Sequence, residues 1–592
     1  MCGIVGFIGK SNALHFVIPA LYRLEYRGYD SAGISVIHNG RVFVAKKKGK
    51  ISALTTYLSE VNFPSYANLG IGHTRWATHG EPSDYNAHPH TDSTGEISVI
   101  HNGIIENFLQ IKNQLKHHSF VSETDTEVIP HLIEEEMKKG KDPETAFLDA
   151  LEKIEGSYAI VMITSKDPNK IFCARKRSPL VVGIIDGVGY IVSSDIPSLV
   201  TFTKKVIPLD DDEVAIVSFD DVKFLKNRQR IYKQPIEIKW DIQEAEKGGY
   251  RHFMLKEIME QPHVVEDTMH EILSVWDEIV VPRYSKILIT ACGTSFHAGA
   301  VGRIWFESIA RKEVDIEYAS ELRYKDKDFQ DSLIISISQS GETADTLEAV
   351  RIAKEKGAKV VGLVNVLGSS LSREADLVIH TNAGPEIGVA ATKTFSAQLT
   401  ALLLLALKLA GFQKSHKIVD ELRRIPEKID RFLSKNNVQD LAEEVATFKN
   451  ALYLGRWISY PVAEEGALKL KEISYIHAEA YPSGEMKHGP IALISQDMLS
   501  VFVMPYDRIF KKTFSNLQEV IARRGKVISV ITQGYENLLP AEVIKISIPQ
   551  TDDLLSPFVS VIPLQLLSYH TAVYLGHDVD QPRNLAKSVT VE

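Results

Sequence analysis

The segments KILITACGTS (residues 286–295) and ALYLGRWISYP (residues 451–461) decide the fold. Each is an apolar strand that runs into a loop of small or polar residues. Each is followed by a helix, another strand and a further helix that ends in a basic residue and glycine, at AKEKG (353–357) and ARRG (522–525). Strands that alternate with helices in this way are typical of parallel βαβ units. The sequence therefore predicts two tandem three-layer α/β/α domains, and we expect the two copies to pack together.

The first 235 residues have a different pattern, with many short strand-like runs and fewer helices. NLGIGHTRWA (68–77), YAIVMIT (158–164) and EVAIVSF (213–219) are examples of such runs. Amphipathic helices are predicted at 13–28 and 125–140. This pattern indicates stacked sheets flanked by helices.

Domain borders follow from these changes in pattern. The polar stretch at 233–252 interrupts the strand rhythm and is typical of a linker. We expect an N-terminal domain, a linker, two α/β/α domains and a C-terminal tail, at residues 1–235, 236–260, 261–425, 426–575 and 576–592.

Composition indicates an ordinary globular protein without a nucleic-acid or membrane partner. Of its 592 residues, 44% are hydrophobic and 24% are charged, and the net charge of −9 gives no support for nucleic-acid binding. The apolar run at 401–410 is too short for a bilayer span and contains Lys408, so we expect a buried helix. The start of the chain lacks the features of a signal peptide, and the spacing of the three cysteines argues against zinc. We therefore expect a cytoplasmic protein.

The opening MCGIVGF places a cysteine directly after the initiator methionine. If Met1 stays, Cys2 is an incidental thiol, which is the favoured interpretation of the opening alone because most cysteines are small buried hydrophobes. If Met1 is removed, Cys2 carries both a thiol and the free α-amine. An α-amine has a pKa of ~7.7–8.0, so it could accept the thiol proton itself.

Three polar islands in the first domain bear on this choice: HTRWATHG (73–80), HNG (101–103) and SETDTE (122–127). Each has a structural explanation of its own, as a surface ion pair, a turn or a helix capping box. Together with an N-terminal cysteine they favour a thiol-dependent site. Asn102 and Gly103 offer the parts of an oxyanion hole. The other candidates are Arg75, Thr78 and His79 for a carboxylate, Trp76 as a wall or lid, and Asp125 for an ammonium group.

The segment SLIISISQSGETADTLEAV (332–350) is a strand, a serine-rich turn and a helix. Hydroxyl groups and backbone N–H groups at such a turn would face a small anion. A plain capped helix is an equally good explanation, and the absence of GK[ST] excludes a nucleotide P-loop. A similar loop, ACGTS, strengthens the case for a phosphorylated ligand, because sites in open α/β sheets lie at the carboxyl ends of strands. The candidate residues are Ser338, Ser340 and Thr343 in the first loop and Thr294 and Ser295 in the second.

The predicted helix at 462–480 places Glu465, Lys469 and Glu472 on one face. A solvated ladder of charges is the commoner meaning of such spacing. His488 follows in the glycine-bounded loop GEMKHGP, and Lys587 lies in the tail AKSVTVE, where a lysine is normally just a solvated charge.

Taken together, these motifs resemble the family of isomerising glutamine–fructose-6-phosphate aminotransferases, also called glucosamine-6-phosphate synthases. YRGYDSAG, HTRWATHG, HNGIIEN, SETDTE, CGTS, SQSGET, KEISYIHAEAY, KHGP and AKSVTVE occur in the family's order and span the whole chain. Neither the SGGxDS loop of an asparagine synthetase nor the DDSxxRGT loop of a phosphoribosyl-pyrophosphate amidotransferase is present in the sequence. The resemblance implies an α/β multidomain fold. Its parts would be an N-terminal α+β four-layer glutaminase domain of the Ntn type and two tandem sugar-isomerase (SIS) domains.

For the first domain, the resemblance implies that Cys2 becomes residue one and attacks the side-chain amide of glutamine, with its α-amine as the base. Asn102 and Gly103 would hold the oxyanion, and Trp76 would gate an internal ammonia channel. Arg75, Thr78, His79 and Asp125 would hold the two ends of glutamine.

For the SIS domains, the resemblance implies that Lys587 forms a Schiff base with fructose 6-phosphate and that Glu472 moves a proton between C1 and C2. His488, contributed by the neighbouring subunit of a homodimer assembled through the SIS domains, would assist ring opening. Glu465 and Lys469 would orient Glu472. The sugar phosphate would bind to Thr294, Ser295, Ser338, Gln339, Ser340 and Thr343. The implied activity begins hexosamine synthesis and requires no metal or organic cofactor.

Two positions depart from the family pattern. Ala391 stands where serine is usual, so one hydroxyl contact to the sugar is missing, and Met486 replaces the common leucine. Two alternatives share the SIS fold: a sugar-phosphate-binding regulator with a vestigial glutaminase, and a deglycase. The presence of Cys2, Glu472, His488 and Lys587 together argues against the regulator. Cys2 argues against the deglycase, because such proteins lack a competent N-terminal cysteine.

Overall fold

The computed structural model describes residues 2–77, 79–238, 247–411 and 416–589. The chain divides into two compact units. Unit 1 comprises Met1–Ala245 with Glu342–Ala344 and Ala586–Glu592, and unit 2 comprises Glu246–Gly341 and Asp345–Leu585. Each unit is described by itself below.

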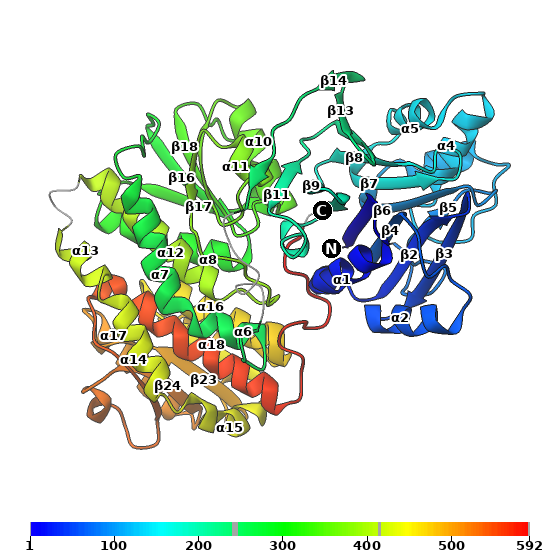
Figure 1. Cartoon of the computed structure of the whole chain (residues 1–592). Helices are drawn as coiled ribbons and strands as arrows, with labels where there is room; N and C mark the ends of the chain where they lie inside the picture. The colour runs from blue at the N-terminus through cyan, green and yellow to red at the C-terminus, as the bar shows by residue number, and fades with distance from the viewer. Residues whose placement is uncertain (1, 78, 239–246, 412–415, 590–592) are drawn as a thin grey trace. The chain divides into compact units, whose positions relative to one another are not determined.

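Unit 1 contains two mainly antiparallel sheets and five α-helices among its described residues (Figure 1). The eight-stranded sheet has the order β15 (Ile236–Glu237), β11 (Lys205–Pro208), β9 (Val181–Ile185), β10 (Gly189–Ser193), β1 (Gly3–Gly9), β4 (Leu69–Arg75), β2 (Ser31–His38) and β3 (Arg41–Lys48). The seven-stranded sheet has the order β14 (Gln229–Ile231), β13 (Val222–Lys226), β12 (Glu213–Ser218), β8 (Lys170–Lys176), β7 (Gly156–Thr164), β6 (Ile97–Ile105) and β5 (His90–Thr91). The helices are α1 (Leu14–Leu24), α2 (Ile51–Glu60), α3 (Phe108–Gln114), α4 (Val128–Lys138) and α5 (Pro143–Leu151).

Three hydrophobic clusters define the four layers of unit 1. One lies between the sheets, where Ile4 and Ile71 of the first sheet meet Val161 and Cys173 of the second. A second joins the first sheet to α1 and α2, and a third joins the second sheet to α3, α4 and α5. Because both sheets are covered on both faces, β1 is buried along its whole length. The order of layers is therefore helix, sheet, sheet, helix, which confirms the predicted fold class.

Unit 2 contains two five-stranded sheets in which every pairing is parallel. The first has the order β17 (Val314–Tyr318), β16 (Lys286–Ala291), β18 (Ser332–Ser338), β19 (Lys359–Val364) and β20 (Leu377–His380). The second has the order β22 (His477–Pro482), β21 (Asn450–Gly455), β23 (Met498–Val503), β24 (Lys526–Thr532) and β25 (Ile544–Ile548). The chain order is 2-1-3-4-5 in both sheets, so the predicted duplication is confirmed.

The described helices of unit 2 form one set with the first sheet, one set with the second sheet and a remaining group. The first set is α8 (Gly293–Ser308), α9 (Ala319–Leu322), α10 (Ala344–Glu355), α11 (Ser370–Glu374) and α12 (Lys393–Ala410). The second set is α16 (Ser459–Ser474), α17 (Phe510–Ile521) and α18 (Ser556–Tyr574). The remaining helices are α6 (Phe253–Met259), α7 (Gln261–Ser274), α13 (His416–Leu422), α14 (Ile425–Lys435) and α15 (Ala442–Ala446).

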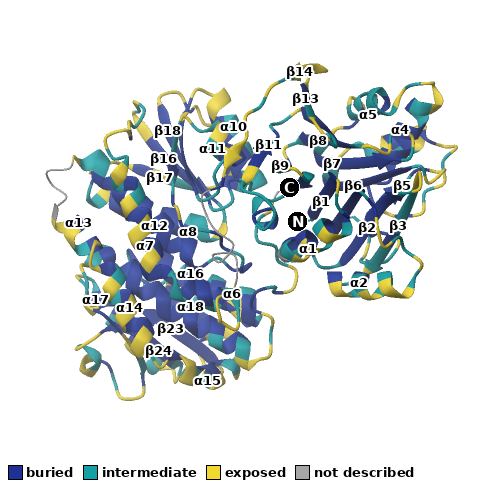
Figure 2. Cartoon of the chain, viewed as in Figure 1, coloured by how far each residue is buried: buried dark blue, intermediate teal, exposed yellow. Residues whose placement is uncertain are grey.

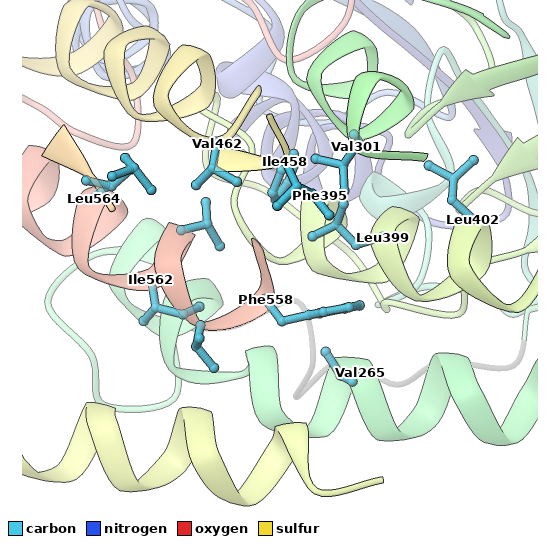
Figure 3. Close-up of a cluster of buried hydrophobic side chains, with 14 of the residues drawn as sticks. Val265, Val301, Phe395, Leu399, Leu402, Ile458, Val462, Phe558, Ile562 and Leu564 are labelled. Carbon is cyan, nitrogen blue, oxygen red and sulfur yellow. The ribbon is translucent and has the colours of Figure 1, made fainter. Parts of the chain in front are cut away.

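The two halves of unit 2 share one hydrophobic core. Val301 and Phe395 of the first half and Val462 of the second belong to the same buried cluster (Figure 3). The Trp305 indole N–H donates a hydrogen bond to the Leu554 carbonyl (2.8 Å), and its ring stacks on Phe558. Helices α16 and α18 are accordingly mostly buried (Figure 2). This shared core confirms the expectation that the duplicated copies pack together.

Two segments with distinctive composition, the polar stretch within 236–260 and the apolar run at 401–410, both contain buried helices. Within 236–260, where a linker is predicted, α6 buries Met254 and Ile258 fully, because its apolar residues recur on one face of a short helix that polar neighbours conceal. Helix α12 contains the apolar run at 401–410, and it is long and apolar enough to cross a membrane by length and composition. It is 83% buried inside unit 2, as predicted for a core helix.

Candidate active site

Cys2 lies at the start of β1, where this central strand pairs with β4. The next residue, Gly3, pairs with Thr74, and a Cβ on Gly3 would lie 2.5 Å from the Thr74 hydroxyl. Only glycine therefore allows the chain to pass this point and bring Cys2 against the end of β4. The Trp76 backbone N–H donates a hydrogen bond to Cys2 Sγ at 3.3 Å.

Asn102 of β6 is fixed beside Cys2 by a histidine from β4. The Asn102 side-chain amide donates to the Cys2 carbonyl at 2.9 Å. His73 Nε2 lies 3.0 Å from Asn102 Oδ1 and 3.1 Å from the His101 carbonyl, so this nitrogen carries the proton. Burial lowers the pKa of His73 to about 3. A neutral His73 therefore orients the amide with its N–H groups toward the cysteine.

Gly103 follows Asn102 with φ of +133°, and a Cβ at this position would lie 1.9 Å from the Ser157 carbonyl. No L-residue fits here, because both the backbone angle and the space require glycine. The predicted oxyanion pair Asn102–Gly103 is thus held rigidly at the strand that passes Cys2.

Arg75 and Asp125 supply opposite charges near the thiol. Asp125 is 4% exposed, and its carboxylate accepts the Ile105 backbone N–H at 2.7 Å. Arg75 is 3% exposed and donates to the carbonyls of His79 and Gly80, the second at 2.9 Å. Its other terminal nitrogen, Nη1, has no hydrogen-bond partner among the described residues. A buried guanidinium nitrogen without a partner is available to an incoming carboxylate.

The structure describes two of the three remaining residues predicted around Cys2. Trp76 and His79 are half-buried, and the His79 ring lies edge-on to Phe108 at 5.6 Å. Thr78 lies outside the described residues. Asp30, which was not predicted as a site residue, accepts the Ala77 backbone N–H at 2.9 Å, and only its place in YRGYDSAG could have pointed to it.

The pKa of the Cys2 thiol is raised, chiefly because water is removed from around the sulfur. The Trp76 N–H and the guanidinium groups of Arg75 and Arg27 oppose this shift but do not reverse it. The thiol of the unliganded protein is therefore protonated at neutral pH, and a nucleophilic role needs a nearby base.

The predicted hydroxyl-rich segments follow β16 and β18, which are adjacent parallel strands of unit 2, although Glu342–Ala344 at the end of the second segment are grouped with unit 1. Thr294 and Ser295 lie in the first turn of α8, not in a loop as predicted, because the helix begins at Gly293. Ser338 ends β18, and its hydroxyl accepts the Gly341 N–H at 3.0 Å. Gln339, Ser340 and Thr343 follow between β18 and α10.

Gly341 makes the turn after β18 possible. Its φ is +66°, and a Cβ would lie 2.2 Å from the Ser369 hydroxyl. Its carbonyl accepts the Leu371 N–H at 3.0 Å, which ties the turn to α11. The backbone of the turn is therefore set by packing before any ligand binds.

The helix predicted at 462–480 ends earlier, at Ser474, because Tyr475 takes a positive φ of 61° and the chain then forms β22 from His477. The charged face of α16 is not a solvated ladder. Glu465 and Lys469 are fully buried, and Lys469 Nζ lies 2.7 Å from Glu472 and 3.4 Å from Glu465. Glu465 accepts a hydrogen bond from Thr294 at 3.1 Å and lies 2.8 Å from His297 Nδ1. This face is buried because it packs against α8 of the other half, which a single helix sequence does not show.

Lys469 remains charged in this setting. Burial alone would lower the pKa of Lys469, but the carboxylates of Glu465 and Glu472 more than offset it and raise the pKa above the ordinary value. A permanently protonated lysine is a poor nucleophile and a good positioning group. Lys469 therefore fits the predicted supporting role and not a Schiff base.

Three further polar residues line this region and were missed in the sequence. His297 pairs with Glu465, and Gln398 donates to Ser295 at 2.9 Å. Glu386 accepts the N–H groups of Thr392 and Thr394 at 2.9 and 3.1 Å, which fixes the segment around Ala391. His297 directly follows ACGTSF and could have been found there, whereas Gln398 is concealed in an apolar helix.

The last two predicted catalytic residues are His488, in a short 3₁₀ helix, and Lys587, in the C-terminal segment outside any helix or strand. His488 ends a short 3₁₀ helix, Glu485–His488, and is exposed, whereas Met486 beside it is fully buried. Lys587 is half-buried. Two residues further on, the Val589 carbonyl accepts the N–H of Ala344, the first residue of α10, at 2.9 Å.

Comparisons with known proteins agree with this arrangement. The family model for the SIS domain matches residues 283–408 and 445–575, and the model for a glutamine amidotransferase domain matches residues 73–201. The chain is 51% identical to the isomerising glutamine–fructose-6-phosphate aminotransferase of Aquifex aeolicus and 48% identical to that of Thermococcus kodakarensis. Each alignment covers all of both chains.

Among solved structures, the C-terminal domain of the glucosamine–fructose-6-phosphate aminotransferase of Francisella tularensis is similar with a TM-score of 0.53 and 42% identity. It covers 57% of this chain and 100% of that one. A tagatose-6-phosphate isomerase structure from Clostridium novyi, at 21% identity and a TM-score of 0.51, shares the SIS fold.

Proposed function

Because this chain belongs to the family of isomerising glutamine–fructose-6-phosphate aminotransferases, we propose that it converts L-glutamine and D-fructose 6-phosphate into L-glutamate and D-glucosamine 6-phosphate. The observation that carries this proposal is the setting of Cys2: an N-terminal thiol held by the Trp76 N–H, with the Asn102 amide bonded to its own carbonyl. This is the arrangement that a thiol needs to attack an amide carbon and have the resulting oxyanion stabilised.

In the glutaminase step, removal of Met1 gives Cys2 a free α-amine. That amine takes the thiol proton, and the thiolate attacks the side-chain amide carbon of glutamine. Asn102 and Gly103 stabilise the oxyanion, and the amine returns the proton to the departing ammonia. Water then releases glutamate from the thioester. The partnerless Arg75 nitrogen supports binding of the α-carboxylate, with Thr78, His79 and Asp125 completing the glutamine site.

In the sugar step, the phosphate binds to Thr294, Ser295 and the turn from Ser338 to Thr343. His488 assists ring opening, and the Lys587 amine condenses with the C2 ketone and releases water. Ammonia displaces the lysine to give an imine at C2. Glu472 then removes a proton from C1 of the protonated imine, which gives a 1,2-enolamine. The same carboxyl group returns the proton to C2 while the C1 hydroxyl loses its own proton, so that C1 becomes the aldehyde. The pairing of Glu472 with Lys469 at 2.7 Å supports this role, because the cation orients the carboxylate.

Ammonia passes inside the protein from the first site to the second, with Trp76 as the gate. In bulk water at neutral pH, ammonia would mostly become ammonium and lose its nucleophilic lone pair. The domain borders at 1–235, 261–425 and 426–575, a homodimer formed through the SIS domains, and a cytoplasmic location are part of the same proposal.

The test is to incubate the purified chain with both substrates and measure glutamate and hexosamine phosphate together. We expect equal amounts of the two products. Intact-mass analysis should show that the active chain starts at Cys2, and Cys2→Ala should abolish glutamine hydrolysis while fructose 6-phosphate still binds. Normal glutaminase activity in a chain that keeps Met1 would contradict the role of the α-amine.

A further inference from the structure

Unit 1 contains a second group of chemically active side chains, formed by α4 and the segment that precedes it. His131 and Glu134 lie on consecutive turns of α4, and His118 follows α3. Their side chains are 2%, 6% and 2% exposed respectively. Ser93, which lies between β5 and β6, places its hydroxyl 3.0 Å from His118 Nδ1. The group therefore joins three separate segments of the chain in a buried place.

One atom from each of the three side chains faces a common point. His118 Nδ1 is 3.0 Å from His131 Nδ1 and 3.2 Å from Glu134 Oε2. His131 Nδ1 is 3.4 Å from the same Glu134 oxygen. Two imidazole nitrogens and a carboxylate oxygen thus form a nearly equilateral triangle of potential ligand atoms.

These distances match a tetrahedral zinc site. Zinc binds nitrogen at about 2.0–2.1 Å and carboxylate oxygen at about 2.0–2.2 Å. At the tetrahedral angle, such bonds place neighbouring ligand atoms ~3.3 Å apart. An imidazole-rich site with one carboxylate also suits zinc chemically, better than calcium or magnesium, which prefer oxygen ligands.

The groups behind the triangle orient it as the outer shell of a metal site does. His118 Nε2 lies 2.8 Å from Glu135, so its proton is on Nε2 and the lone pair of Nδ1 points at the triangle. Glu134 accepts the Ser93 backbone N–H at 3.0 Å, and its other oxygen pairs with Lys138 at 2.8 Å. A histidine whose second nitrogen is held by a carboxylate is the usual arrangement at bound zinc.

We propose that His118, His131 and Glu134 bind one zinc ion, with the Ser93 hydroxyl or a water as the fourth ligand. The site contains no cysteine, so the cysteine spacing that argues against zinc does not bear on it.

The site holds the segment that leads to Asp125. After His118 the chain continues into the turn before α4, where Glu127 accepts the N–H groups of Val121 and Ser122 at 2.8 and 2.7 Å. A metal that joins His118 to α4 would fix both ends of this turn. Its expected effect is on the stability of unit 1, and it is independent of the proposed chemistry at Cys2.

The test uses the full-length, untagged chain carrying Cys2→Ala, so that the Cys2 thiol cannot bind the metal. After treatment with a chelator, zinc is added back and bound metal is measured by competition with a chromogenic chelator. We expect one tightly held zinc per chain and a rise in the temperature of unfolding. Glu135→Gln should weaken the affinity roughly 10–100-fold.

His118→Gln and His131→Gln should each abolish tight binding of the zinc ion. His117→Gln, a change at the exposed neighbour, should retain it. Cobalt(II) added to the Cys2→Ala chain provides a second readout that does not depend on the folding of the histidine variants, and it should give the visible bands of tetrahedral coordination. Zinc binding that is unchanged in both histidine variants, or an octahedral cobalt spectrum, would overturn the proposal.

Discussion

At the scale of single residues, the thiol of Cys2 combines two opposing requirements. It must be protected from adventitious reaction, and it must become a thiolate when glutamine arrives. Loss of hydration raises the pKa of Cys2, and the Trp76 N–H and nearby positive groups moderate that shift. The protein thus keeps the thiol protonated at rest and leaves deprotonation to a base in the catalytic step.

This balance predicts an unusual pH dependence for chemical modification. An ordinary thiol has a pKa of ~8.5, so its alkylation rate levels off above that pH. Because the pKa of Cys2 is raised, the thiolate fraction at pH 7 is smaller, and the rate should still be rising above pH 8.5. Peptide-mapped alkylation of the unliganded chain between pH 6 and 10 measures this. A small thiol such as glutathione serves as the reference, and a plateau below pH 8 at Cys2 would refute the prediction.

A second prediction at this scale concerns the hydroxyl groups after β18. If they bind the sugar phosphate, Ser340→Ala and Thr343→Ala should each lose roughly 0.5–1.5 kcal/mol of binding free energy. The KM for fructose 6-phosphate should then rise about 2–12-fold. Steady-state kinetics at saturating glutamine measures the change.

Ser372→Ala is the matched control, because its hydroxyl donates to the Ser369 carbonyl at 2.7 Å on the neighbouring α11. Its KM should stay at the wild-type value. Equal competition by fructose and fructose 6-phosphate would show that the phosphate is not bound here.

At the scale of elements, unit 1 buries four neutral histidines on and beside its strands. His73, His88, His90 and His101 come from β4, β5, β6 and the chain between them, and His73 stacks on His88 at 4.2 Å. Burial is the largest cause that lowers the pKa of each, to about 3 for His73. All four are therefore uncharged in the folded protein at neutral pH.

The sign of the stability effect follows from these shifts. Between pH 6.5 and about 3 the unfolded chain binds protons that folded His73 rejects, so stability falls as the pH falls below 6.5. Each such histidine contributes a slope of roughly 1.4 kcal/mol per pH unit. In unit 2, Asp507 acts in the opposite direction, because its pKa is raised to about 6 and protonation favours its folded form. We expect unit 1 to lose more stability than unit 2 between pH 7 and pH 5.

Denaturant titrations with thiol labelling can separate the two units. Cys173 is fully buried between the sheets of unit 1, and Cys292 reports on unit 2. The midpoint for exposure of Cys173 should fall more between pH 7 and pH 5 than the midpoint for Cys292. Equal shifts at both cysteines would contradict the prediction.

The same elements show what the sequence could and could not reveal. KILITA and ALYLG are continuous apolar runs, which is the mark of parallel strands buried on both faces, so β16, β21 and the duplication were predictable. The glycines at 3 and 103 lie within recognisable motifs. Periodicity placed Glu465 and Lys469 on a polar face but could not show that α8 covers it. The contact between His73 and Asn102 joins residues 29 positions apart, and nothing local in either motif indicates it.

At the scale of the whole molecule, the C-terminal segment is anchored in steps. Asp580 accepts the N–H groups of Phe253 and Met254 at 3.0 and 2.9 Å, at the start of α6. Arg583 donates its backbone N–H to the Tyr475 hydroxyl at 2.8 Å and stacks its guanidinium on that ring. The segment is therefore fixed up to four residues before Lys587.

The tail around Lys587 is held by its backbone at Val589, whose side chain does not dock in an apolar core. The side chain of Val589 is 46% exposed, so this residue is held by its backbone bond to Ala344 and not by hydrophobic burial. Val591 lies outside the described residues. Two anchors on either side of Lys587 nevertheless restrict the path of the chain that carries it.

Lys587 is the subject of the last prediction. Exchange of a ketone oxygen for nitrogen proceeds more easily through an imine, and some amine must form it. Lys469 is a poor candidate for that role, because two carboxylates pair with its ammonium group and raise its pKa. Borohydride reduction in the presence of fructose 6-phosphate, followed by peptide mapping, should place the hexose adduct on Lys587. Lys587→Arg keeps the charge but cannot form the imine, and it should lose synthase activity while glutamine hydrolysis persists. An adduct on Lys469, or full synthase activity in Lys587→Arg, would assign the Schiff base to another residue.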